Sequence, residues 1–155
     1  MRRPCLMSPA PDQGSGGLTI RLALAANPGS VRAGLAQLLD VPALADLSED
    51  HRATVELVLA EVLNNIAEHA YAAGAGATSV TLRLISTGLS CQFSDCGLPM
   101  PGGRLPDGKL SVTPVTPTAD LPEGGFGWHL IRSLTQDLHY TRADGQNRLA
   151  FLIPG

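Results

Sequence analysis

The 155-residue sequence predicts a single α+β domain in which helices pack on one face of a mixed, mostly antiparallel sheet. Three observations predict this class. Leu18–Ala25 alternates apolar with more polar side chains, residues 55–71 carry apolar side chains at helical spacing, and two later segment pairs each flank a turn signal. Strands in hairpins, with helices inserted between them, favour two layers, one of sheet and one of helices.

Composition excludes several classes of protein. The formal net charge is −3 and Lys109 is the single lysine, so no basic excess favours direct binding of nucleic acid. No apolar run approaches the length of a membrane span, and no long apolar segment follows the arginines near the start. We therefore expect a cytoplasmic protein that does not associate with membranes. Residues 1–16, rich in Pro, Gly and Ser, predict a disordered leader before one domain at 17–155.

Three helices are predicted, each with an identifiable start. Either Asn27 or Ser30 can cap the first helix, because both side chains can accept hydrogen bonds from free backbone N–H groups. Ser48 can cap the long central helix in the same way. The third helix follows Gly125 and Gly127. The resulting order of elements is β, α, α, β, β, loop, α, β, β.

The remaining strands are predicted as two hairpins, 78–85 with 89–94 and 138–142 with 148–153. Between these hairpins, residues 97–124 contain so many Pro and Gly residues that a helix or an interior strand is excluded. A loop of this length inside a compact domain is usually a linker or a functional lid. Because ordered elements follow it, a lid is the favoured interpretation.

One row of polar residues lies along the central helix. Glu61, Asn65 and His69 follow at i, i+4 and i+8, so they stack on the flank of the apolar face. Partly burying such groups costs free energy unless partners or a ligand satisfy them. The ordinary alternative is a helix boundary satisfied by backbone or water. A metal site is less favoured, because the His-Glu-x-x-His pattern is absent and an i, i+8 pair lies about 12 Å apart along the axis.

Two further clusters involve glycine. Asp95-x-Gly97 ends a predicted strand, and Gly125-x-Gly127 opens a helix, where free N–H groups and the helix dipole favour phosphate. Taken singly, the first pattern is compatible with an ordinary turn and the second with a loop end. The sequence has no Walker-type lysine motif and no Gly-x-Ser-x-Gly elbow, which disfavours P-loop enzymes and serine hydrolases.

The order and spacing of the three clusters resemble the GHKL (Bergerat-fold) ATPases. AEVLNNIAEHAY is similar to their N box, FSDCGLPMP to their G1 box and GGFGWHLI to their G2 box. The short form, with ANPGSVR ending at Arg32, most resembles the anti-sigma-factor serine/threonine kinases of bacterial partner-switching systems, over about residues 18–154. The resemblance implies a two-layer α/β sandwich, an ATP lid at about 97–124, and ATP with Mg²⁺ as cofactors.

The resemblance also implies roles for matching residues in the first two boxes. Asn65 would ligate Mg²⁺ through its amide oxygen, and Glu61 would accept the proton of an attacking hydroxyl. Asp95 would accept a hydrogen bond from the adenine amino group, while Gly97 would let the base lie against the backbone. His69 matches a frequent family histidine, for which satisfied packing is an equal alternative.

Further roles are implied at the phosphates and on the far side of the base. Gly125 and Gly127 would present N–H groups to the phosphates, and Arg32 matches a family arginine that reaches them. Asn147 is the expected replacement for a superfamily threonine that contacts adenine through water. Glu123 stands where family kinases often carry an arginine.

An acid beside a triphosphate is unfavourable, so either transfer is slow or another cation substitutes for the missing arginine. Arg104 and Lys109 in the lid are the candidates.

The implied function is an ATP-dependent serine/threonine protein kinase that is also an anti-sigma factor. It would bind an RNA polymerase sigma factor and phosphorylate a serine of a small STAS-type antagonist, and a homodimer is expected from the family. The alternative, prompted by Glu123, is a nucleotide-binding anti-sigma module with little or no kinase activity. A catalytic fragment of a sensor histidine kinase is disfavoured, because too few residues precede the first strand for a phospho-accepting helical hairpin.

Overall fold

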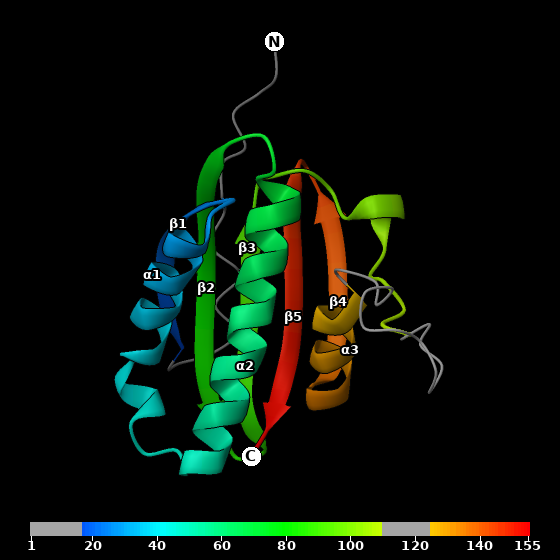
Figure 1. Cartoon of the computed structure of the whole chain (residues 1–155). Helices are drawn as coiled ribbons and strands as arrows, with labels where there is room; N and C mark the ends of the chain where they lie inside the picture. Colours follow the sequence, from blue (N-terminus) through cyan, green and yellow to red (C-terminus); the bar gives the residue numbers. More distant parts are fainter. Residues whose placement is uncertain (1–16, 110–124) are drawn as a thin grey trace, which may run out of the picture.

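A computed structural model of the chain describes residues 17–109 and 125–155. Within them, five strands form one sheet in the spatial order β1-β2-β3-β5-β4, and three α-helices pack on one face of it (Figure 1). All four strand pairings are antiparallel. The predicted α+β class and two-layer architecture are confirmed, whereas the predicted leader and residues 110–124 of the predicted lid lie outside the described residues.

The order of strands and helices is the predicted one. In chain order the elements are β1 (Leu18–Ala25), α1 (Pro28–Leu39), α2 (Glu49–Asn65), β2 (Ala75–Ile85), β3 (Gly88–Asp95), α3 (Gly125–Leu134), β4 (Gln136–Ala143) and β5 (Gln146–Pro154). No helix in the described ranges is long and apolar enough to cross a membrane.

Side-chain caps start the first two helices. The Asn27 side chain accepts a hydrogen bond from the Ser30 N–H at 2.8 Å, and Ser48 accepts one from the His51 N–H at 3.2 Å. Of the two candidates for α1, Asn27 is therefore the cap. The Ser30 hydroxyl instead accepts a hydrogen bond from the Ala25 N–H at 2.9 Å and ties the helix to the end of β1.

The central helix does not continue regularly past Asn65. It widens into a π-helical turn, η2 (Ile66–Ala70), in which the Tyr71 N–H donates to the Ile66 carbonyl five residues earlier. The Tyr71 hydroxyl then donates to the Ala77 carbonyl of β2 at 2.6 Å. Glu61 and Asn65 keep their predicted one-turn spacing on α2, but His69 lies on the widened turn and leaves the regular i, i+8 row.

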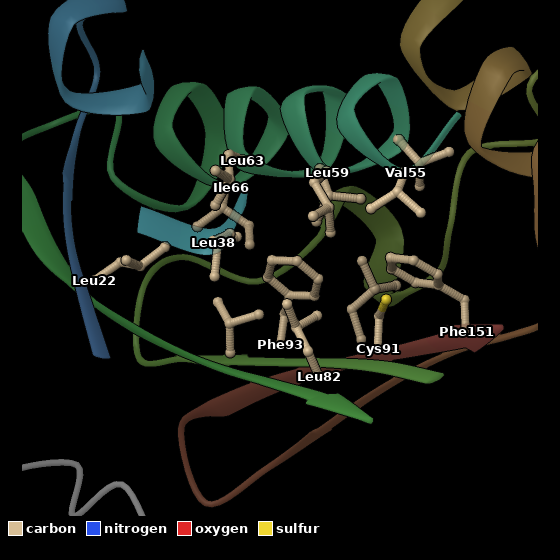
Figure 2. Close-up of a cluster of buried hydrophobic side chains, with 14 of the residues drawn as sticks. Leu22, Leu38, Val55, Leu59, Leu63, Ile66, Leu82, Cys91, Phe93 and Phe151 are labelled. Carbon is tan, nitrogen blue, oxygen red and sulfur yellow. The ribbon is translucent and has the colours of Figure 1, made fainter. Parts of the chain in front are cut away.

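The hydrophobic core lies between α2 and the sheet (Figure 2). Leu59 and Leu63 on the inner face of α2 are fully buried, above Phe93 of β3. The Phe93 ring stacks with that of Phe151 of β5 at a centroid distance of 5.9 Å. This packing fixes the position of α2 over β3 and β5, and so the place of the polar flank that carries Glu61 and Asn65.

The last hairpin sets the register on which the site depends. Asp144 and Gly145 have φ angles of 52° and 79°, as a type I′ turn requires, so the predicted turn is confirmed. This turn places Arg142 of β4 opposite Asn147 of β5, and Asn147 in turn lies opposite Asp95 of β3. Three polar side chains therefore occupy neighbouring positions on three adjacent strands.

Candidate nucleotide-binding site

A cavity lies among the end of α2, the ends of β3 and β5, and the start of α3. Its empty volume is about 430 Å³, part of which is open to solvent. Most of the wall is apolar and includes Val62, Ile66, Trp128 and Leu149. A few polar groups in an apolar cleft are typical of a small-molecule site. Those lining it here are Asn65, His69, Asp95, Tyr140 and Asn147.

Asp95 is the buried carboxylate of this cavity, with 5% of its surface exposed. Its Oδ1 accepts hydrogen bonds from the Gly97 N–H at 2.9 Å and from Asn147 Nδ2 at 2.8 Å. Burial raises the pKa of the carboxyl above its ordinary value, while these two hydrogen bonds and the charge of Arg142 oppose the rise. Oδ2 receives no hydrogen bond from the described part of the chain, so one acceptor atom is available to a ligand.

Gly97 allows a close approach of two backbone segments. A Cβ at this position would lie 2.4 Å from the Ala70 carbonyl oxygen and 2.6 Å from the Ala70 Cβ. The neighbouring Leu98 N–H donates to the same carbonyl at 2.9 Å. The glycine is therefore required where the chain leaving β3 crosses the π-helical turn, and this crossing forms one end of the cavity.

The start of α3 meets the polar flank of α2. A Cβ on Gly127 would lie 2.7 Å from Glu61 Oε2 and 3.6 Å from Asn65 Nδ2. Asn65 Nδ2 is buried and has no hydrogen-bond partner among the described residues. A buried amide in this condition is unusual, and a bound ligand is one way to satisfy it. The first and third clusters are thus brought together, with Gly125 at the first position of α3.

Two predicted site residues lie in more exposed positions. His69 lines the cavity but is exposed on the π-helical turn. Arg32 is exposed on α1 and does not line the cavity. The structure therefore does not bring Arg32 into the apolar cavity, and its contact with phosphates stays a prediction.

The described part of the lid packs along α3. Arg132 Nε donates to the Pro106 carbonyl at 2.8 Å, and His129 Nδ1 lies 3.2 Å from the Gly108 carbonyl. Arg104 and Lys109 are exposed on this segment. Glu123, whose acid group prompted the question of slow transfer, lies outside the described residues.

Sequence reasoning missed two residues, Tyr140 and Arg142. The Tyr140 hydroxyl donates to Asn147 Oδ1 at 2.7 Å, and Arg142 Nη1 donates to the same oxygen. The signal that could have found Arg142 is the hairpin itself, because a two-residue Asp144-Gly145 turn pairs residue 142 with residue 147. No comparable local signal marks Tyr140.

The buried Asp95 carboxylate in an apolar cavity, the unpartnered Asn65 amide and the glycine-containing start of α3 together form a small-molecule site in a two-layer α+β domain. The chain belongs to the histidine kinase-like ATPase domain family, whose model matches residues 24–153. The predicted GHKL-type membership and Bergerat-type fold are therefore confirmed.

Two named relatives are protein kinases. The chain is 34% identical over 99 residues to the serine/threonine-protein kinase BtrW of Bordetella bronchiseptica, which covers 63% of this chain and 67% of BtrW. It is 28% identical over 98 residues to the serine-protein kinase RsbW of Bacillus thuringiensis, covering 61% of this chain and 59% of RsbW. The chain thus spans less than two thirds of the RsbW length.

Proposed function

We propose that the chain is an ATP-dependent serine/threonine protein kinase and an anti-sigma factor of a partner-switching system. It would bind an RNA polymerase sigma factor and phosphorylate a serine of a small STAS-type antagonist. The family match and the two kinase relatives support this proposal. The observation that carries it is the meeting of Gly127 with Glu61 and Asn65, beside a cavity lined by Asp95.

The cavity and Asp95 would bind the adenine base. A planar purine suits the apolar wall, and the free Oδ2 of Asp95 would accept a hydrogen bond from the exocyclic amino group. Guanine carries a carbonyl oxygen at that position, which would oppose an acceptor. A site built around such a hydrogen bond discriminates strongly against a base that cannot form it.

Asn65 and the start of α3 would hold the phosphates and one Mg²⁺ ion. Mg²⁺ prefers oxygen ligands and typically combines one or two protein groups with water and phosphate oxygens, so the amide of Asn65 fits it. The ion would supply charge neutralisation at the phosphates. Backbone N–H groups at Gly125 and Gly127 favour anions for the same electrostatic reason.

Glu61 would act as the general base. Its carboxylate lies against Gly127 at the start of α3, which is where the phosphates are proposed to bind. From there it would accept the proton of a serine hydroxyl as that oxygen attacks the γ-phosphorus of ATP, while the bond from this phosphorus to the bridging oxygen breaks and ADP leaves. The phosphorylated serine then carries about −2 charges close to Glu61, and this repulsion would release the antagonist.

Two measurements test the proposal. Calorimetry with ATP, ADP and GTP, with and without Mg²⁺, tests the cavity, the base selectivity and the metal together. Transfer of radiolabelled phosphate to the STAS-type antagonists encoded in the same genome then tests the kinase activity. We expect ATP to bind far more tightly than GTP and label to appear on one serine.

The outcomes separate the candidate functions. Absence of ATP binding would refute the proposal altogether. ATP binding and sigma-factor capture without transfer of label would favour the nucleotide-binding anti-sigma module that Glu123 suggests. The homodimer and the roles of Arg32 and His69 stay predictions of the family resemblance, and the cytoplasmic location stays a prediction from the composition of the sequence.

A further inference from the structure

We infer that Tyr140 and Arg142 are positioning residues for base selectivity, because they and the Leu98 carbonyl fix which way the Asn147 amide faces Asp95. The inference rests on the proposed function, since it concerns how Asp95 recognises adenine. Neither residue belongs to the three sequence boxes. Both lie on β4, on the far side of β5 from Asp95.

The Asn147 amide has no hydrogen-bonding capacity left for a ligand. The side chain is 5% exposed, and its Nδ2 donates to Asp95 Oδ1 at 2.8 Å and to the Leu98 carbonyl at 2.9 Å. Its Oδ1 accepts from both Tyr140 and Arg142. Two donors and two acceptor sites are all that a primary amide offers. We therefore infer an indirect role for Asn147, acting through Asp95, while its predicted water-mediated contact with adenine stays untested.

The partners of Asn147 permit only one orientation of the amide. The guanidinium of Arg142 can only donate, and the Leu98 carbonyl can only accept. Nδ2 must therefore face Leu98 and Asp95, while Oδ1 faces β4. The assignment of the amide atoms thus follows from the chemistry of its neighbours.

The orientation of this amide decides what Asp95 can recognise. With Nδ2 facing it, Oδ1 of Asp95 is stabilised as an acceptor and Oδ2 is left to accept from an amino group. If the amide turned over, its oxygen would face the carboxylate, and the proximity of two acceptors would favour a protonated Asp95. A protonated carboxyl can donate, so it would lose its preference for the adenine amino group over the guanine carbonyl.

The same two residues hold the chain that leads into the lid. The Tyr140 hydroxyl accepts from the Met100 N–H at 3.0 Å, and Arg142 Nη1 donates to the Gly97 carbonyl at 3.0 Å. Residues 97–100, the first part of the predicted lid, are therefore tied to β4 at both ends. Recognition of the base and the position of this segment depend on one hydrogen-bonded cluster.

The test compares Arg142→Met with the matched control Arg148→Met. Both arginines are exposed and lie on neighbouring strands, Arg142 on β4 and Arg148 on β5. Arg148, however, donates to Gln146 Oε1 and not to Asn147. We expect Arg142→Met to weaken ATP binding about tenfold and leave GTP binding unchanged, as loss of a charge-assisted hydrogen bond predicts. Arg148→Met should bind both as the wild type does, and Arg142→Lys should recover most of the ATP affinity.

A second variant gives a readout without nucleotide. Tyr140→Phe removes the acceptor for the Met100 N–H, so hydrogen exchange at Met100 should accelerate about fivefold in the free protein. The same variant should lower the ratio of ATP to GTP affinity. Faster hydrogen exchange at Met100 with an unchanged ratio of ATP to GTP affinity would mean that the cluster stabilises only the local structure. That result would overturn the inference.

Different experimental results would refute the proposed function and the positioning role of Tyr140 and Arg142. A wild-type protein that binds neither nucleotide refutes the proposed function and, with it, this inference. A wild-type protein that selects ATP, with Arg142→Met indistinguishable from Arg148→Met, overturns the inference alone.

Discussion

Replacing Asp95 with Asn should separate the stability of the fold from nucleotide binding. The two side chains have nearly the same shape, and the new amide oxygen can still accept from the Gly97 N–H and from Asn147 Nδ2. The amide NH₂ then takes the place of Oδ2 at the cavity. The substitution therefore keeps the internal hydrogen bonds, removes a buried charge, and changes the free acceptor into a donor.

The effect on ATP binding follows from that change. The NH₂ group would face the amino group of adenine, so one hydrogen bond is lost and a buried donor is left unpaired. Such a mismatch costs about 1–3 kcal/mol, which corresponds to a loss of affinity of roughly 10-fold to 100-fold. GTP binding should not be weakened, because the guanine carbonyl can accept from the new donor.

The effect on stability has the opposite sign. Burial raises the folded-state pKa of Asp95 above the ordinary value of 3.8, so the carboxyl favours folding most when protonated. This contribution to the free energy of unfolding is complete below pH 3.8. It is lost as the pH rises through the raised folded-state pKa. We therefore expect Asp95→Asn to unfold at a higher temperature than the wild type at neutral pH. The difference should shrink as the pH falls towards 3.8.

Thermal unfolding followed by circular dichroism and calorimetric titration with ATP and GTP measure the two effects. Asp95→Glu is the matched comparison, because it keeps the charge but moves it by one methylene. An ATP dissociation constant equal to that of the wild type would mean that adenine is recognised elsewhere. A lower unfolding temperature at neutral pH would mean that the charge of Arg142 and the greater strength of the two hydrogen bonds to a charged acceptor outweigh the cost of burying that charge.

Three further substitutions test the other parts of the site. Glu61→Gln should keep ATP affinity but abolish phosphate transfer; unchanged turnover would exclude Glu61 as the base. Asn65→Ala should remove the difference between ATP titrations with and without Mg²⁺, and a persisting difference would place the metal elsewhere. Gly97→Ala should destabilise the fold by about 1–3 kcal/mol, because its Cβ would lie 2.4 Å from the Ala70 carbonyl oxygen. Gly74→Ala, with nothing within 4 Å, is its control in thermal unfolding, and equal unfolding temperatures would contradict the expected clash.

The elements could be predicted because their signals are local. The alternation in Leu18–Ala25 and the cap at Ser48 depend on neighbouring residues alone, and both appear as expected. The π-helical turn Ile66–Ala70 could not be predicted in this way. Its surroundings include the hydrogen bond from Tyr71 to β2 and the crossing of Gly97, both of which are tertiary contacts.

The residues of the candidate site also differ in whether a local sequence signal or a tertiary contact determines their role. Asp95 and Asn65 stand in recognisable boxes, since each is the residue type that the proposed contact requires. The part played by Asn147 depends instead on how many of its hydrogen-bonding positions other residues already occupy, which no spacing pattern reveals. Because Arg142 and Asp95 bond to opposite atoms of that amide across three strands, a one-residue change of register in either pairing would disconnect them. Selectivity for the base would then depend as much on the hairpin turn at Asp144-Gly145 as on the carboxylate that contacts it.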